Sequence, residues 1–393
     1  MRQDAQRLET IRTVVSASKH VNTFGHGRLV TAVLVLLVLA GIGPLVVVQN
    51  LNPGHVLAAG QQKSFQELGP MPGSCQGCDT YGSGLSPDGS TVVGSAYVCP
   101  DGSTTCTSTG KTEAYRWTVA NGYQLLGDLN GSFGNSPSAT GSAAFAASSD
   151  GSVVVGESPQ GSNSFGGFRW TASTGMQPLP SPELNQAFGV SADGSMIVGQ
   201  FGWFNNTTGR QGFFGSSMPP SSEALGVSPD GTIAVGADRQ RAFRWTAATG
   251  EQFFLSVQGP SDADAISGDG TVIVGEFQLP SGPYHAFRWT ASTGMVDLGT
   301  LGGPGSRALA VNHDGSVIVG TSFTNQQTTS NHAFRWTAQT GMQDLNSLVS
   351  GSLELTFATG ISADGTVIGG QGLAKLQKFR SQTQPFRAVL PLP

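Results

Sequence analysis

Charged residues are scarce in this sequence, at 11% of 393 residues, with 20 basic side chains against 25 acidic ones. A helical bundle presents a charged solvent face, and a long disordered chain carries a higher net charge than the −5 found here. No run of Lys and Arg follows residue 28, so the electrostatic footprint of a nucleic-acid-binding protein is lacking. Nucleic acid is therefore not an expected partner.

Glycine and small polar residues take the place of the missing charges. The chain has 56 Gly and 21 Pro without the triplet period of collagen. Hydrophobic residues make up 38%, and the mean hydropathy is −0.06. Apolar residues interleaved with Gly, Ser and Thr are typical of many short strands joined by turns, which predicts an all-β fold.

The N-terminus carries the largest charge asymmetry. Residues 1–28 contain five basic side chains against two acidic ones, and residues 29–48 form a run of 20 residues without a charge. At 1.5 Å per helical residue this run spans about the 30 Å of a bilayer core, and the basic flank is expected to stay in the cytoplasm. We therefore expect a transmembrane anchor at 29–48 followed by a linker at 49–63.

A cleaved signal peptide is the alternative interpretation of the same segment. Its hydrophobic region is then 29–48, and Val56-Leu57-Ala58 resembles a small-residue cleavage site. Under both interpretations, residues 64–393 lie outside the cytoplasm, either anchored to the membrane through the N-terminal segment or secreted.

Seven copies of one pattern follow, each an Asp-Gly pair with a second glycine six residues after the Asp. The mean spacing is about 46 residues. The pairs begin at Asp88, Asp150, Asp193, Asp230, Asp269, Asp314 and Asp364, and the second glycines are Gly94, Gly156, Gly199, Gly236, Gly275, Gly320 and Gly370. Because the Asp recurs in every copy, we expect it to have the same structural role in seven turns.

An aromatic-Arg-Trp segment follows most of the Asp-Gly pairs. It is degenerate at Phe213-Phe214-Gly215 and ends as Phe386-Arg387-Ala388 in the last copy. Five of the six Trp belong to the repeat and are expected to pack between neighbouring units, namely Trp117, Trp170, Trp245, Trp289 and Trp336.

Each repeat divides into four short runs with the lengths of strands. The sixth copy, for example, has runs at 308–312, 316–320, 332–337 and 342–345. The first two are joined through Ser-Pro-Asp-Gly or a close variant, which is typical of a tight hairpin. Four strands in about 46 residues match one propeller blade. The sequence thus predicts an all-β, seven-bladed β-propeller over residues 64–393.

Both ends of the repeat region are incomplete blades. A lone strand-like run at 65–69 precedes the first copy, and the last copy ends near 386–390 with its fourth strand missing. The prediction is that the N-terminal run supplies that strand, so that no open sheet edge is left at the seam.

Residues 294–337 resemble the HAF repeat, named for His-Ala-Phe and found in bacterial extracellular proteins. His332-Ala333-Phe334 carries the motif, and His285-Ala286-Phe287 stands at the equivalent place one copy earlier. The resemblance extends over about residues 64–393 and implies export and repeats, without an established chemistry. The Ser-Pro-Asp-Gly segments at 86–89 and 228–231 are more loosely similar to WD-type and TolB-type propellers, which implies that the strand before this turn lies nearest the central channel.

All four cysteines fall within 32 residues, as Cys75-x-x-Cys78 and as Cys99 with Cys106. Two such pairs suit a zinc ion or redox chemistry, whereas export to an oxidising compartment favours disulfides. We expect disulfides, with the connectivity left open, and we expect no metal and no cofactor.

The positions that vary most between copies mark the candidate site. Five residues before the Ser or Asn of each turn stand Tyr81, Ala143, Gln186, Glu223, Asp262, Arg307 and Phe357. In a propeller these positions approach one mouth of the channel. The candidate ligand-binding residues are Tyr81, Gln186, Glu223, Asp262, Asp264 and Arg307. Solvated loop ends without a ligand are the alternative interpretation.

Insertions at 95–113 and at 201–212, with Trp203 and Phe204, are expected on the same face as partner contacts.

These features favour a non-catalytic binding module for an envelope glycan or an extracellular or periplasmic protein. An extracellular polysaccharide hydrolase or lyase needs a carboxylate pair on one face, and only Glu223 with Asp262 or Asp264 approaches one. A structural or assembly role in the cell envelope is the third alternative. The oligomeric state is left open by the sequence.

Overall fold

Short antiparallel strands make up nearly all of the chain that the computed structural model describes. These described residues are 63–74, 78–99, 110–129, 141–160, 164–180, 184–214, 222–254, 259–280, 282–325, 331–375 and 381–392. They form seven four-stranded sheets. None of the helices within these ranges is long and apolar enough to cross a membrane. The predicted segments 1–28 and 29–48 and nearly all of the 49–63 linker lie outside the described residues.

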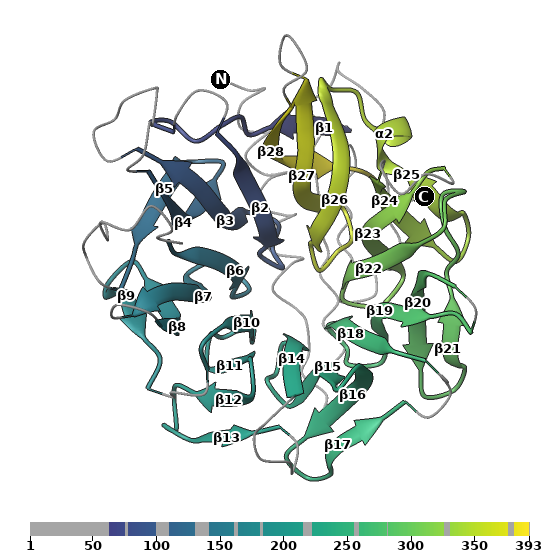
Figure 1. Cartoon of the computed structure of the whole chain (residues 1–393), viewed down its shortest axis with the longest axis horizontal. Coiled ribbons are helices and arrows are strands. Elements are labelled where there is room, and N and C mark those ends of the chain that lie inside the picture. The colour runs from purple at the N-terminus through teal and green to yellow at the C-terminus, as the bar shows by residue number, and fades with distance from the viewer. Residues whose placement is uncertain are drawn as a thin grey trace, which may run out of the picture. The chain divides into compact units, whose positions relative to one another are not determined.

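The sheets follow one another along the chain, and each is one blade of a ring (Figure 1). Blade 1 is β2 (Thr80–Leu85), β3 (Thr91–Val98), β4 (Lys111–Thr118) and β5 (Gly122–Gly127); blade 2 is β6 (Ala143–Ala147), β7 (Val153–Gln160), β8 (Ser164–Thr171) and β9 (Gly175–Pro178); blade 3 is β10 (Ala187–Val190), β11 (Met196–Gly199), β12 (Gly202–Asn205) and β13 (Gln211–Phe213). Blade 4 is β14 (Ser222–Val227), β15 (Ile233–Asp238), β16 (Arg241–Thr246) and β17 (Gly250–Phe253); blade 5 is β18 (Ser261–Ile266), β19 (Ile273–Gln278), β20 (Tyr284–Thr290) and β21 (Gly294–Asp297); blade 6 is β22 (Ser306–Val311), β23 (Val317–Phe323), β24 (Asn331–Thr337) and β25 (Gly341–Asp344).

Blade 7 contains strands from both ends of the repeat region. Its order is β1 (Ser64–Glu67), β28 (Ser381–Val389), β27 (Val367–Lys375) and β26 (Leu353–Ile361). β1 pairs antiparallel with β28, so that Phe65 faces Ala388. The short helix α2 (Leu345–Leu348) connects blades 6 and 7. The predicted seven-bladed propeller and its closure by the N-terminal strand are therefore confirmed.

The hydrophobic core is divided into seven clusters, one at each junction between blades. At the junction of blades 5 and 6, Val274 and Leu298 of blade 5 pack with Ile318 and Phe334 of blade 6. At the seam, Val367 of blade 7 joins residues of blade 1. A single four-stranded sheet cannot bury both of its faces, so each blade depends on its two neighbours for burial. The repeat Trp side chains share one register opposite the second strand, as in Val92 with Trp117.

The repeated Asp closes the hairpin between the first two strands of each blade. In blade 3, the Ser191 hydroxyl donates to Asp193 (2.7 Å), the Ser195 amide donates to the same carboxylate (2.9 Å), and the Met196 amide donates to Ser191 Oγ (2.9 Å). The bonds that the Asp193 carboxylate accepts lower its pKa, the one from Ser191 most strongly. Gly194 has a φ of 72°, which explains the glycine after the Asp. The other six turns have the same arrangement, with Asn312 in place of Ser in blade 6.

The histidines of the two His-Ala-Phe segments hold the outermost strands of their blades. His332 Nδ1 lies 2.6 Å from Asp344, and His285 Nδ1 lies 2.9 Å from Asp297. Both described cysteines, Cys78 and Cys99, are disulfide-bonded. Cys75 and Cys106 lie outside the described residues, so the connectivity stays a prediction.

Blade 3 differs from the sequence prediction. Trp203 and Phe204 are not in an insertion loop, because β12 (Gly202–Asn205) is the third strand of this blade. Phe204 is buried, and the Trp203 ring lies 5.8 Å from that of Trp245. The aromatic pair expected to form the degenerate third strand instead ends the fourth, where Phe213 is the last residue of β13 and Phe214 is buried against Phe243. The insertion predicted at 95–113 is also shorter, because β3 continues to Val98 and β4 begins at Lys111.

Candidate functional site

Each innermost strand carries an extra residue relative to the second strand, a β-bulge, and β26 of blade 7 carries two. In blade 5, Ala263 pairs with Gly275 and Ala265 pairs with Val274, which leaves Asp264 unmatched. A Cβ on Gly275 would lie 1.9 Å from the Asp262 carbonyl oxygen. All seven second glycines of the repeat show this approach, at 1.9 to 2.0 Å. The bulge thus explains why this position of the repeat is a glycine and why the extra residue is directed toward the channel.

One extra residue from each blade lines a central cavity of about 370 Å³ along the channel. Six are uncharged, and Phe145 and Phe188 have ring centroids 5.5 Å apart. These six are Ser83, Phe145, Phe188, Leu225, Leu309 and Thr359. The seventh is Asp264, and it gives one side of the channel a carboxylate that the other six bulges lack.

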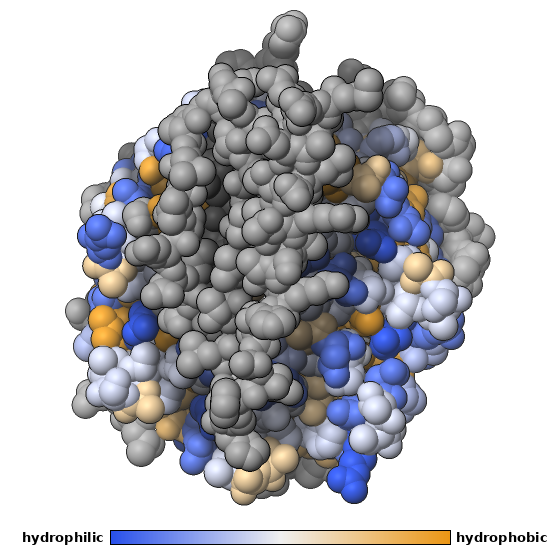
Figure 2. All heavy atoms as spheres, turned by 180° about the vertical axis from the view of Figure 1, so that it is seen from behind, coloured by the Kyte–Doolittle hydropathy of each residue, from blue (hydrophilic) through white to orange (hydrophobic). Residues whose placement is uncertain are grey.

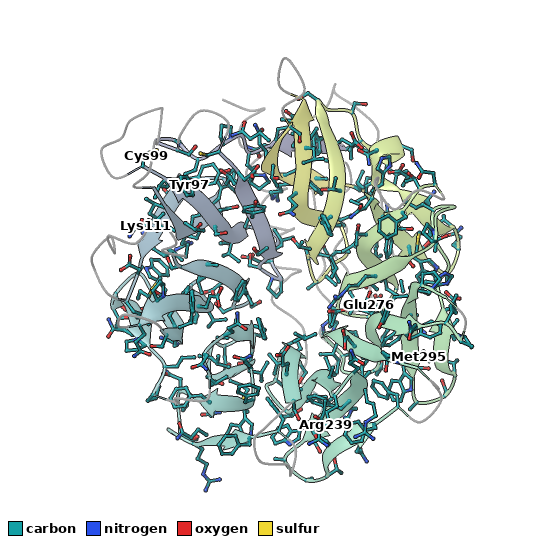
Figure 3. All side chains as sticks on the ribbon, viewed as in Figure 1. Tyr97, Cys99, Lys111, Arg239, Glu276 and Met295 are labelled. Carbon is teal, nitrogen blue, oxygen red and sulfur yellow. The ribbon has the colours of Figure 1, made fainter. Side chains whose placement is uncertain are left out.

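Arg307 at the start of blade 6 binds this carboxylate. Its Nε donates to Asp264 Oδ2 (3.0 Å), and its Nη2 donates to Oδ1 (2.6 Å). Its Nη1 donates to Glu276 of β19 (3.2 Å). Figure 3 shows Glu276 where blades 5 and 6 meet. We call Asp262, Asp264, Glu276 and Arg307 the acidic cluster, because Arg307 binds two of the carboxylates and Asp262 stands opposite Glu276 on the paired strand.

Burial and mutual repulsion hold protons on this cluster near neutral pH. Removal from water, together with the smaller effect of the Asp264 and Asp262 charges and against the opposing effect of Arg307, raises the pKa of Glu276 to about 7. Burial likewise raises the pKa of Asp264 to about 6, although Arg307 opposes the shift. The attraction of the carboxylates raises the pKa of Arg307 despite its burial. The cluster therefore changes its charge in the physiological pH range.

A second cavity, of about 300 Å³, lies between blades 5 and 6 on the other side of Arg307. Its charged lining residues are Glu276 and Arg307, and Pro283, Tyr284 and Phe323 give it apolar surface. The side chain of Arg307 is 35% exposed and that of Asp264 only 8%. The ion pair between them thus separates this interblade cavity from the central channel.

Two of the remaining predicted residues, Gln186 and Glu223, join neighbouring blades elsewhere in the ring. Gln186 donates to Glu157 of blade 2 (2.6 Å), and Glu223 accepts from Gln200 of blade 3 (3.5 Å). Tyr81 is 41% exposed and donates to Asp79. The structure therefore brings Asp262, Asp264 and Arg307 together, and it places Tyr81, Gln186 and Glu223 outside the acidic cluster.

The sequence prediction did not include Glu276, although its position follows a rule. It comes directly after the second glycine of its repeat, as Glu157 and Gln200 do in blades 2 and 3. Each of these residues faces the first strand of the next blade, where Arg307, Gln186 or Glu223 meets it. Across the described residues, no group of three or more His, Cys, Asp and Glu side chains is arranged to hold a metal ion.

Comparison with known proteins adds little to this geometry. No family model matches the sequence, and no curated protein is significantly similar to it. Among solved structures, TolB from Acinetobacter baumannii is similar at 12% identity with a TM-score of 0.41, covering 76% of this chain and 79% of that one. A putative TolB from Agrobacterium tumefaciens has 12% identity and a TM-score of 0.42, covering 80% of this chain and 91% of that one. These similarities are too low to carry an argument about function, and the HAF-repeat assignment stays a prediction.

Proposed function

We propose that this chain is an exported, non-catalytic recognition module, and that its ligand binds at the acidic cluster where blades 5 and 6 meet. One observation carries the proposal. Seven blades repeat one frame, and of the seven bulge residues that line the channel, one from each blade, only Asp264 of blade 5 is charged. A buried ion pair contributes little net stability, because desolvation offsets most of the attraction. One polar site on a repeated frame suits selective recognition instead.

Binding fits the acidic cluster better than catalysis does. Glycoside hydrolysis uses two carboxyl groups about 5 to 9.5 Å apart, with the scissile bond between them. Here Arg307 stands between Asp264 and Glu276 and donates hydrogen bonds to both. A sugar ring would have to displace the guanidinium to reach both carboxylates.

The ligand is proposed to be a polar group of an envelope protein or glycan. The large hydrophobic residues that are exposed among the described ones are scattered over blades 1, 3 and 5, at Tyr81, Val119, Leu125, Phe213 and Val296. In Figure 2 the coloured surface shows hydrophobic residues as separate small areas between hydrophilic ones. Polar recognition in a cavity therefore suits this surface better than a broad apolar interface.

Export is part of the same proposal. Residues 1–28 are proposed as a basic cytoplasmic segment, 29–48 as an anchor or signal segment, and 64–393 as a propeller of HAF-type repeats. The charge asymmetry and the disulfide-bonded Cys78 and Cys99 support an oxidising compartment. The His-Asp pairs of blades 5 and 6 give the His of each His-Ala-Phe segment a structural role.

A retention experiment tests the proposed function. The full chain in mild detergent is immobilised and incubated separately with envelope proteins and envelope polysaccharides of a bacterium that produces it. We expect retention of one fraction without new reducing ends, and loss of most of that retention for Glu276→Gln. Glu157→Gln is the matched control, because Glu157 has the equivalent position in blade 2 and should leave retention intact. New reducing ends that depend on Glu276 would show an enzyme, and equal retention by all three proteins would place the site elsewhere.

A further inference from the structure

The interblade cavity combines two kinds of surface. Tyr284 and Phe323 give it aromatic walls, and Glu276 reaches it from the neighbouring strand. The Glu276 side chain is 17% exposed, so a ligand in the cavity can contact its carboxylate. A volume of about 300 Å³ is at the small end of ligand sites, and it suits one side chain or a small organic molecule.

The charge of the acidic cluster determines the sign of the ligand. Three carboxylates face one guanidinium, so the fully ionised cluster carries two uncompensated negative charges. Arg307 already donates through Nε and Nη2 to Asp264 and through Nη1 to Glu276, and an anion would have to displace one of these two carboxylates. A cation instead supplies the charge that the cluster lacks.

The walls determine the shape of that cation. An ammonium group at Glu276 would gain an ion pair, and the aromatic rings of Tyr284 and Phe323 in the same lining favour a cation close to them. An aliphatic stem behind the charge would cover the apolar surface of Tyr284 and Phe323, as the methylenes of lysine commonly do.

We infer that the interblade cavity binds an alkylammonium group, either the lysine side chain of a partner protein or a free aliphatic amine. The inference rests on the proposed function and specifies its ligand. Binding requires ionised Glu276, and the groups that set its charge are Asp262, Asp264 and Arg307, with Tyr284 in the same cavity. Protonation of Glu276 lowers the affinity, so the affinity falls as the pH drops through about 7 and rises above it.

Calorimetry on the full chain in mild detergent tests the inference. The probes are N-acetyl-lysine methylamide and 1,5-diaminopentane, and N-acetyl-norleucine methylamide is the uncharged control. Between pH 6 and pH 8, we expect the affinity for the amines to rise about tenfold, since ionised Glu276 increases by that factor around a pKa of about 7. We also expect proton release, measured as a heat that varies with the ionisation enthalpy of the buffer.

Two variants separate ligand binding from folding. Glu276→Gln is expected to bind the amines at least tenfold more weakly and without the pH dependence, whereas Glu157→Gln binds like the wild type. Binding of the lysine amide identifies a protein lysine as the source, and binding of the diamine alone identifies a free amine. Equal binding of the norleucine control, or no amine binding at pH 8, overturns the inference. If envelope retention still depends on Glu276 in that case, the proposed function stands; if retention is also absent, both fail.

Discussion

Deletion of residues 64–69 is expected to lower the melting temperature of the propeller by roughly 10 °C. The deletion removes β1, and with it the Phe65 ring, which lies 5.9 Å from that of Phe386. It also removes the Glu67 carboxylate, which accepts from the Ser352 hydroxyl (2.7 Å) and the Leu353 amide (3.3 Å). Loss of a packed Phe and of charge-assisted hydrogen bonds costs about 5 kcal/mol, which corresponds to a shift of that size in a domain of this length.

Circular dichroism melting curves of the full chain measure this effect. Gln66→Ala is the matched control, because Gln66 is exposed on the same strand and its loss removes no buried contact. A deletion variant that melts within about 2 °C of the control would show that the seam does not depend on β1.

Substitution of Gly275 by Ala is expected to destabilise the propeller by about 3 kcal/mol and to weaken ligand binding as well. The new Cβ would lie 1.9 Å from the Asp262 carbonyl oxygen, and it would contact backbone that no side-chain rotation can move. Relief of this contact requires the bulge to shift, and the bulge holds Asp264 toward Arg307. The change therefore affects stability and the acidic cluster together.

Urea unfolding and amine calorimetry on the same variant measure the two effects. Gly282→Ala in the same blade is the control, since its nearest neighbour would be a Leu279 carbon 4.0 Å away. Equal stability of the two Ala variants would contradict the explanation of the repeated glycine, and normal binding by an unstable Gly275→Ala would separate the bulge from the site.

Much of the fold could be predicted because the same turn and strand residues recur in seven copies of the repeat. Asp193 and Gly194 are a turn that sequence alone identifies, since the Asp carboxylate accepts from the amide two residues on and the Gly adopts a positive φ. The incomplete last copy likewise predicted the role of β1. The second glycine was recognisable as a pattern, but its cause, the approach of a carbonyl oxygen across a bulge, appears only in three dimensions.

The predicted position of the third strand of blade 3 was wrong because this strand, β12, lacks the aromatic-Arg-Trp motif. β11 and β12 are joined through Gln200 and Phe201, where the other blades carry longer loops or a different short turn. Gly202 begins the strand, and Phe204 occupies the register of the repeat Trp, opposite Ile197. Without the motif, the sequence of this strand resembles the other third strands less than Phe213-Phe214 does.

The candidate site could be predicted only in part, because the repeat pattern identifies residues of one strand but not their contacts with the next blade. The variable positions before each turn include Asp262 and Arg307, and the sequence placed Asp264 beside them. Glu276 was missed because it lies on the second strand, and its meeting with Arg307 depends on how adjacent blades are packed. Gln186 and Glu223 occupy the same ring as Arg307, but their partners Glu157 and Gln200 leave no comparable excess of negative charge.

Photo-crosslinking in the producing cell tests the central claim, that a partner binds between blades 5 and 6. Benzoylphenylalanine replaces Tyr284, which lines the interblade cavity, or Phe213, which is 42% exposed on the outer strand of blade 3. We expect an adduct at position 284 that disappears with Glu276→Gln or with excess 1,5-diaminopentane, and no such adduct at position 213. An adduct of equal yield at both positions, or one at 284 that is insensitive to Glu276→Gln, would contradict the claim.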